Sequence, residues 1–286
     1  MKNLPILIYE GVQRCQSAEI PRSYLGMSLA GNPCELSTWH YWRHTTGKEI
    51  DGRILMLFQL GNKVEEVVCA GLRKAGFILS NAYPDKQLTF SDFNGWFSGH
   101  PDGLIQSEFG PMILEIKSAN TNKFKQFSEK GVREVYPAYY MQMQLYMHYS
   151  GLKKACFVVM KKDDSTIYSE EVDYDEKQVE ITLSRVKKIL TTHTETGKIY
   201  IPEKASIDPK SEICQWCKYQ VNCYEPETQY QTVQSCRSCA YMNIKSDWKP
   251  FCGHSAHKVE LKNLNRACPQ WAWVLQTPFT IDEIKF

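Results

Sequence analysis

The chain has 286 residues, of which 43% are hydrophobic and 23% are charged, as in an ordinary folded globular protein. This composition excludes a disordered chain, a collagen-like repeat and a coiled coil. The 34 basic and 32 acidic residues give a formal net charge of +2, so the molecule as a whole has no strongly basic surface. The unusual feature is a set of 11 cysteines, seven of which follow residue 213: Cys214, Cys217, Cys223, Cys236, Cys239, Cys252 and Cys268.

In the first half of the chain, the spacing of apolar residues changes from helical to strand-like. Residues 1–50 are aromatic and irregular, whereas residues 54–76 repeat apolar side chains at helical spacing up to Gly76. Between residues 86 and 119 short apolar runs alternate with Gly, Pro and Asp, which predicts strands. We expect these strands at residues 88–90, 95–99, 103–105 and 112–116.

The second half predicts a helix at 137–150, strands at 156–160 and 167–172, and an amphipathic helix at about 175–193. This order predicts an α/β fold, with a central mixed β-sheet flanked by helices. After Pro202 the periodicity fades and the cysteines begin. We therefore expect two domains, residues 1–228 and a small cysteine-rich module at 229–286.

The chain carries no segment suited to a membrane. The apolar run at residues 4–8 is too short for a signal peptide, and no stretch reaches the ~18 apolar residues of a membrane span. We therefore expect the protein in a reducing cytoplasm. Clustered cysteines there act as metal ligands or redox groups rather than as disulfides.

Two acidic residues and a lysine are predicted to meet on the sheet. Glu115 and Lys117 stand two apart in a strand and so point to one face, and Asp102 lies in the turn before the neighbouring strand. Paired carboxylates suit Mg²⁺ or Mn²⁺, and a lysine beside them can stabilise a phosphate under attack. Glu65, on the preceding helix, can add a further carboxylate. Taken singly, each residue is more typical of a surface strand or an ordinary turn than of a site, and only their combination favours a site.

In this order the motifs resemble the PD-(D/E)xK nucleases, over about residues 23 to 225. Gly61-xxx-Glu65 and Gln142-xxx-Tyr146 are similar to further motifs of the RecB-type and lambda-exonuclease-type branches. The resemblance implies a restriction-endonuclease-like core. It implies metal ligation by Glu65, Asp102, Glu115 and Ile116, and a catalytic role for Lys117. Gln142, preferred over Gln144 because of its spacing to Tyr146, would help to hold the lysine and the attacking water.

A basic segment follows the proposed catalytic strand. Residues 117–133 contain five basic residues against one acidic residue, and Phe124 and Phe127 stand between the lysines. Such a pattern suits a DNA end, because cations neutralise phosphates and rings stack on bases. A solvated segment with buried rings explains the two phenylalanines equally well. The predicted DNA-binding residues are Lys123, Lys125, Lys130, Arg133 and Tyr146.

The cysteines divide into two sets. The first cysteine set joins Cys34, which stands at a turn into a helix, to Cys214, Cys217 and Cys223. One early cysteine with three late ones resembles AddB-type and CRISPR-adaptation nucleases, which implies a [4Fe–4S] cluster. Leu36 departs from the arginine often found there in those relatives. Zinc is the alternative, although zinc sites usually draw their ligands as two local pairs.

The second cysteine set is Cys236, Cys239, Cys252 and Cys268, a pattern typical of structural zinc. His254 and His257 are spare candidates as ligands. Of the remaining cysteines, Cys69 and Cys156 fall in apolar runs and are predicted to lie in the core, and Cys15 has no assigned role.

These features together predict a Mg²⁺- or Mn²⁺-dependent DNA exonuclease that acts at DNA ends in recombination or repair, of phage type. Its partners would be DNA and a single-strand annealing or recombination protein, and its oligomeric state is left open. One alternative is an endonuclease or a CRISPR-adaptation-type processing nuclease. Another is a catalytically silent nucleic-acid-binding protein. For a phage-encoded chain, the expected location is the cytoplasm of the host.

Overall fold

The computed structural model describes residues 3–17, 22–45, 47, 49–191, 199–225, 234–244, 247–255, 257–259, 264 and 266–271. The chain forms two compact units, each built from separated segments. Unit 1 contains Met1–Ile20, Ile50–Phe90 and Ser98–Glu180, and unit 2 contains Pro21–Glu49, Ser91–Phe97 and Ile181–Phe286. The predicted domain boundary between residues 228 and 229 lies outside the described residues and stays a prediction.

Unit 1 is built on a five-stranded sheet of order β2-β5-β6-β7-β8. Its strands are β2 (Leu79–Ser80), β5 (Gly103–Ser107), β6 (Gly110–Ala119), β7 (Lys154–Lys161) and β8 (Ile167–Asp173). The pair β6–β7 is parallel and the other pairs are antiparallel, so the sheet is mixed, as the sequence predicts. Four helices accompany it: α1 (Leu4–Ser17), α3 (Gly52–Lys74), α4 (Thr121–Val135) and α5 (Pro137–Ser150). The α/β class is therefore confirmed.

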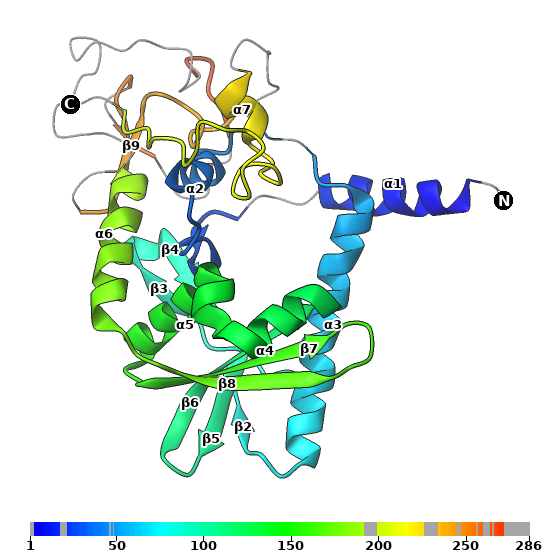
Figure 1. Cartoon of the computed structure of the whole chain (residues 1–286). Helices are drawn as coiled ribbons and strands as arrows, with labels where there is room; N and C mark the ends of the chain where they lie inside the picture. Colours follow the sequence, from blue (N-terminus) through cyan, green and yellow to red (C-terminus); the bar gives the residue numbers. More distant parts are fainter. Residues whose placement is uncertain are drawn as a thin grey trace. The chain divides into compact units, whose positions relative to one another are not determined.

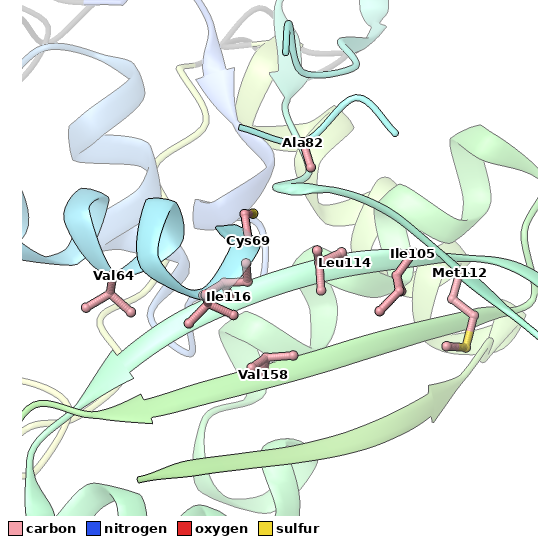
Figure 2. Packing of buried hydrophobic residues seen from close by; sticks show 9 residues of the cluster. Val64, Cys69, Ala82, Ile105, Met112, Leu114, Ile116 and Val158 are labelled. Carbon is pink, nitrogen blue, oxygen red and sulfur yellow. The ribbon is translucent and has the colours of Figure 1, made fainter. Parts of the chain in front are cut away.

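The two faces of this sheet are covered by different helices. On one face, α3 packs Val64, Val68 and Cys69 against the sheet residues Leu114 and Ile116, among others (Figure 2). On the other face, Phe157 of β7 contacts Phe127 of α4 and Tyr139 of α5. Figure 1 shows α4 and α5 together over the strands. Since strand residues alternate between faces, Glu115 and Lys117 point to the side of α4 and α5.

Unit 2 contains short elements. They are β1 (Leu25–Gly26), η1 (Met27–Leu29), α2 (Glu35–Trp42), η2 (Phe93–Gly95), α7 (Gln220–Tyr224), β9 (Met242–Ile244), β10 (Pro250–Cys252) and β11 (His257–Lys258). The last three strands form an antiparallel sheet of order β11-β10-β9. A second small sheet has the order β1-β4-β3, in which β3 is Phe90–Asp92 and β4 is Phe97–Gly99. The aromatic residues Trp39, Trp42 and Trp96 are buried in this unit.

Most predicted elements are present with small shifts at their ends. The helix 137–150 is confirmed as α5, and the predicted helices 54–76 and 175–193 appear as α3 and α6 (Glu176–Thr191). Residues 192 and 193 lie outside the described residues. Cys69 is buried in the core and Cys156 packs against it, as predicted.

The local structure differs from the expectations in three places. The first 50 residues are not irregular, because they contain α1 and α2. Residues 121–135, which cover most of the basic segment and for which no helix was predicted, form α4, which contains the non-helical residue Gly131. The apolar repeat of residues 54–76 does form a helix, but not all of its apolar side chains are buried, since Phe58 and Val67 are both 58% exposed. None of the described helices is long and apolar enough to cross a membrane.

Candidate active site

Asp102, Glu115 and Lys117 come together in unit 1, as the sequence predicts. Lys117 donates a hydrogen bond from its ammonium to Oε1 of Glu115. Asp102 lies between β4 and β5, and its Oδ2 accepts a hydrogen bond of 2.6 Å from the backbone N–H of Ile116. The β5–β6 hairpin therefore holds Asp102 against the strand that carries the other two groups.

Burial perturbs all three ionisable groups. Glu115 is 0% exposed, and burial raises its pKa to about 8, although Lys117 opposes this shift. Burial also raises the pKa of Asp102. Burial alone would lower the pKa of Lys117, but the carboxylates of Glu115 and Asp102 outweigh it and raise the pKa. Oε2 of Glu115 is buried without a hydrogen-bond partner, which leaves one carboxylate oxygen available to a ligand.

Glu65 of α3 belongs to the same electrostatic group. Its pKa is raised to about 7 by burial and by the negative charge of Asp102, while Lys117 acts in the opposite direction. Oε1 of Glu65 accepts a hydrogen bond of 2.8 Å from Nε2 of Gln87, a residue that the sequence did not single out. Gln87 immediately precedes the strand expected at 88–90 and belongs to no motif, so no sequence signal marked it as a site residue.

The two glutamines of α5 have different surroundings. Nε2 of Gln142 donates to the hydroxyl of Tyr146 at 3.0 Å, and this hydroxyl donates to the carbonyl of His100 at 2.9 Å. Gln142 and Tyr146 thus support the loop that carries Asp102. Gln144 instead donates to the carbonyl of Asp173 and accepts from the N–H of Asp175. These contacts tie Gln144 to the end of β8, away from the Asp102 loop.

Tyr146 is 2% exposed, so its side chain supports the site rather than presenting a surface to DNA. The predicted contact with DNA is corrected on this point. Ile116 was expected among the metal ligands. Its side chain lies in the hydrophobic core shown in Figure 2, so only its backbone carbonyl is left for that role.

The predicted DNA-binding cations lie on α4. Lys125 pairs with Glu129 at 3.7 Å, Lys130 with Glu134 at 3.3 Å and Arg133 with Asp175 at 3.4 Å. Lys123 donates to Gln126. Of the two phenylalanines, Phe127 is 1% exposed and belongs to the core, whereas Phe124 is partly buried under the ammonium of Lys161. The helix therefore presents exposed cations, most of them with an acidic neighbour, and one partly accessible ring.

The first cysteine set gathers in unit 2. Cys34 precedes α2, and Cys214 and Cys217 lie before α7, which carries Cys223. The pKa of the Cys223 thiol is raised to about 11 by burial and then by the neighbouring Cys34, Cys217 and Cys214. Cys34 therefore lies near enough to influence the Cys223 thiol, although about 180 residues separate Cys34 from Cys214 in the sequence.

The second cysteine set lines one cavity of about 240 Å³, together with Tyr241, His254 and Trp271. The side chain of His257, the other spare candidate, lies outside the described residues. Burial, followed by the nearby Cys239, Cys268 and Cys252, raises the pKa of Cys236 to about 11. In the described part of the chain, no three Cys, His, Asp or Glu side chains have the arrangement of a metal site. The two cysteine assignments and the divalent-metal site at Glu65, Asp102 and Glu115 therefore all stay predictions.

Two buried arginines lie beside the second cysteine set. Arg43 and Arg237 are both 0% exposed. Arg43 donates to the carbonyl of Cys239 at 2.6 Å, and Arg237 donates to the carbonyl of Trp42 at 2.8 Å. Three of their nitrogens, Nε and Nη1 of Arg43 and Nη2 of Arg237, have no hydrogen-bond partner. Among the described residues, no carboxylate acts on either arginine, which is costly for a buried charge.

Comparisons with known proteins give one family match. Residues 40–153 match the family model of the YqaJ-like viral recombinase domain. This region covers less than half of the chain, but it contains Glu65, Asp102, Glu115, Lys117 and Gln142. No curated protein sequence matches the chain significantly.

Solved structures show partial likeness. An alkaline exonuclease from Laribacter hongkongensis has 18% identity and a TM-score of 0.44, over 59% of this chain and 87% of that chain. The same enzyme in complex with dAMP has 18% identity and a TM-score of 0.42, over 59% and 86%. A phage-related exonuclease from Haemophilus somnus has 18% identity and a TM-score of 0.33, over 46% and 67%.

Proposed function

We propose that the chain is a divalent-metal-dependent deoxyribonuclease that hydrolyses phosphodiester bonds from DNA ends, in phage-type recombination or repair. The observation that carries the proposal is the group formed by Asp102, Glu115 and Lys117 on the β5–β6 hairpin. The match of residues 40–153 to a viral recombinase domain supports it.

The residues of this site fit a divalent cation. Three carboxylates, from Glu65, Asp102 and Glu115, lie within electrostatic reach of one ammonium, and the free Oε2 of Glu115 is buried. Hard cations such as Mg²⁺ and Mn²⁺ prefer carboxylate oxygens. We assign Glu65, Asp102, Glu115 and the Ile116 carbonyl as the residues that would hold the metal. When bound, such a metal supplies a water of lowered pKa and draws charge from the phosphate.

The protein's own groups supply the rest. The permanently charged Lys117 stabilises the negative charge that develops on the phosphate, because it acts in a site that is largely closed to water. The hydrogen bonds from Gln142 through Tyr146 to His100 keep the Asp102 loop in place. The exposed cations Lys125, Lys130 and Arg133 of α4, together with the half-buried Lys123, neutralise phosphates of the DNA backbone.

For the cysteines, we propose a [4Fe–4S] cluster at the first cysteine set and structural zinc at the second. Soft thiolates suit both groups. The uncompensated Arg43 and Arg237 fit the second assignment, because four thiolates around one Zn²⁺ carry a negative charge that would balance two buried cations. The proposal includes a cytoplasmic location, the host's for a phage-encoded chain, and a single-strand annealing or recombination protein as partner.

Digestion of end-labelled linear DNA with Mg²⁺ or Mn²⁺ tests the nuclease. We expect the wild type to release nucleotides from linear DNA, to spare closed circular DNA and to stop on chelation. Lys117→Ala should lower kcat by about 10³-fold or more, because it removes a charge that acts in the transition state. Cleavage of circular DNA would instead indicate an endonuclease. DNA binding without cleavage under any metal would indicate a catalytically silent binding protein.

A further inference from the structure

An exposed aromatic ring is connected to Lys117 through a second ring. The Lys117 ammonium lies 5.0 Å from the centroid of the Tyr139 ring. The Tyr139 ring in turn stacks on Tyr136, with centroids 4.1 Å apart and an angle of 28° between the planes. Tyr136 is 41% exposed. The stack therefore runs from the proposed catalytic lysine to solvent.

This stack is anchored in the core of unit 1. Tyr139 contacts Phe157 at 6.3 Å between centroids, and Phe157 contacts Phe127 at 5.4 Å. Phe157 and Phe127 are 0% and 1% exposed. The backbone of Tyr136 is fixed as well, since its N–H donates to Val132 and its carbonyl accepts from the N–H of Tyr139, both at 2.9 Å. Tyr136 is thus a ring held in place at the junction of α4 and α5.

We propose that Tyr136 stacks on an unpaired base of the DNA end while Lys117 faces the phosphate that is cut. This inference rests on the proposed nuclease function and adds the part of the substrate that the site reads. An aromatic ring stacks on any of the four bases, so the contact provides affinity without sequence preference. Stacking on bases was one of two open interpretations of Phe124 and Phe127, and Phe127 cannot fill this role because it is buried in the core.

The chemistry defines the form of the substrate. Inside a duplex, both faces of a base are stacked on neighbouring bases, and none is open to a protein ring. A blunt end offers only the outer face of its last base pair, whereas a frayed or single-stranded end frees a whole unpaired base. The cations of α4, which ends beside Tyr136, can hold the backbone of such a strand. The preferred substrate is therefore a DNA end with at least one unpaired nucleotide.

The test combines protein variants with altered DNA. Tyr136→Ala should raise KM for an oligonucleotide end by about 5- to 150-fold, the range for one lost base stack, with kcat within a few-fold of the wild type. Tyr136→Phe keeps the ring and should behave like the wild type. Phe109→Ala is the matched control, because Phe109 is an 80% exposed ring at the opposite end of the β5–β6 hairpin. An abasic nucleotide is then placed at each terminal position in turn.

If Tyr136 stacks on a base, the effects of the abasic nucleotide and of Tyr136→Ala on binding should not add. At one position, the abasic nucleotide should weaken binding to the wild type by the same factor as Tyr136→Ala weakens binding to intact DNA. At that position it should not weaken binding to Tyr136→Ala any further. If each abasic position affects the wild type and Tyr136→Ala equally, the inference is overturned. Binding is also followed without cleavage, in Ca²⁺, by the fluorescence of 2-aminopurine at that position. Quenching by the wild type and not by Tyr136→Ala supports stacking even if no DNA is hydrolysed, whereas equal signals refute it.

Discussion

At the scale of single residues, the alternation of β6 separates two environments. Ile116 enters the hydrophobic core, while its neighbours Glu115 and Lys117 occupy the opposite face. Burial removes the water that would hydrate the carboxylate of Glu115. The charge of Lys117 offsets only part of this cost, so the pKa of Glu115 rises to about 8. The site is therefore electrostatically incomplete until a further cation binds.

This shift predicts how the stability of the metal-free protein depends on pH. The pKa of Glu115 is about 8 in the folded chain against an ordinary value of 4.5, so the folded state holds the proton more tightly. The free energy of unfolding should therefore fall as pH rises from about 4.5 to about 8, by up to about 5 kcal/mol from this group. Urea unfolding in EDTA at several pH values measures this slope.

Glu115→Gln is the control, since it removes the titrating group and keeps the shape. Its slope should be smaller than that of the wild type but not zero, because the pKa values of Asp102 and Glu65 are raised as well. Adding Mg²⁺ should restore the stability of the wild type at pH 8 more than that of the variant. Parallel slopes for the two proteins in EDTA would contradict the assignment.

At the scale of elements, the β5–β6 hairpin fixes the position of Asp102. Gly103 follows Asp102 with φ +153°, and a Cβ there would lie 2.4 Å from Cβ of Ala82. Gly110, at the other end of the hairpin, also has a positive φ, of +110°, but a Cβ there would meet nothing within 4 Å. Substituting each glycine by alanine therefore separates two costs: backbone strain, which both positions have, and steric overlap with Ala82, which only Gly103 has.

Gly103→Ala should therefore lower the free energy of unfolding by about 2 to 4 kcal/mol, the sum of strain and overpacking, and should reduce cleavage by the folded protein at least about 10-fold by displacing Asp102. Gly110→Ala should cost only about 1 kcal/mol and leave cleavage unchanged. Thermal unfolding and single-turnover cleavage of end-labelled DNA check both variants. Equal effects of the two substitutions would show that contact with Ala82 does not position Asp102.

The sequence was sufficient to predict those elements and site residues that are defined by a short local pattern. Glu115 and Lys117 could be placed on one face because a strand alternates with a period of two, and α5 was bounded by Pro137 and its apolar run. The helix α4 escaped prediction because it is polar and contains the non-helical Gly131. The contacts of Tyr139 with Lys117, and of Tyr146 with His100, depend on how α5 crosses the sheet, which no local pattern encodes.

At the scale of the whole molecule, the two cysteine sets belong to unit 2, which is assembled from distant segments. Cys34 comes from the segment Pro21–Glu49, and its partners come from Ile181–Phe286. Closing so long a loop costs conformational entropy, which a metal bound by ligands from both segments offsets. The same unit buries Arg43 and Arg237 without a carboxylate partner in the described chain. Both features predict that bound metal stabilises the folded structure of unit 2.

Elemental analysis of protein purified without oxygen should therefore find about four iron atoms and one zinc atom per chain. Cys34→Ser should lose the iron and its visible absorption and retain the zinc, whereas Cys268→Ser should lose the zinc and retain the iron. Cys15→Ser is the matched control, because Cys15 is exposed and belongs to neither set, and it should keep both metals.

Removing zinc with a chelator should lower the melting temperature of the protein. It should also expose the chain around Arg237 to protease, because the two buried arginines would lose the negative charge that balances them. Zinc at both sets would refute the cluster, and a metal-free chain of unchanged stability would refute both assignments.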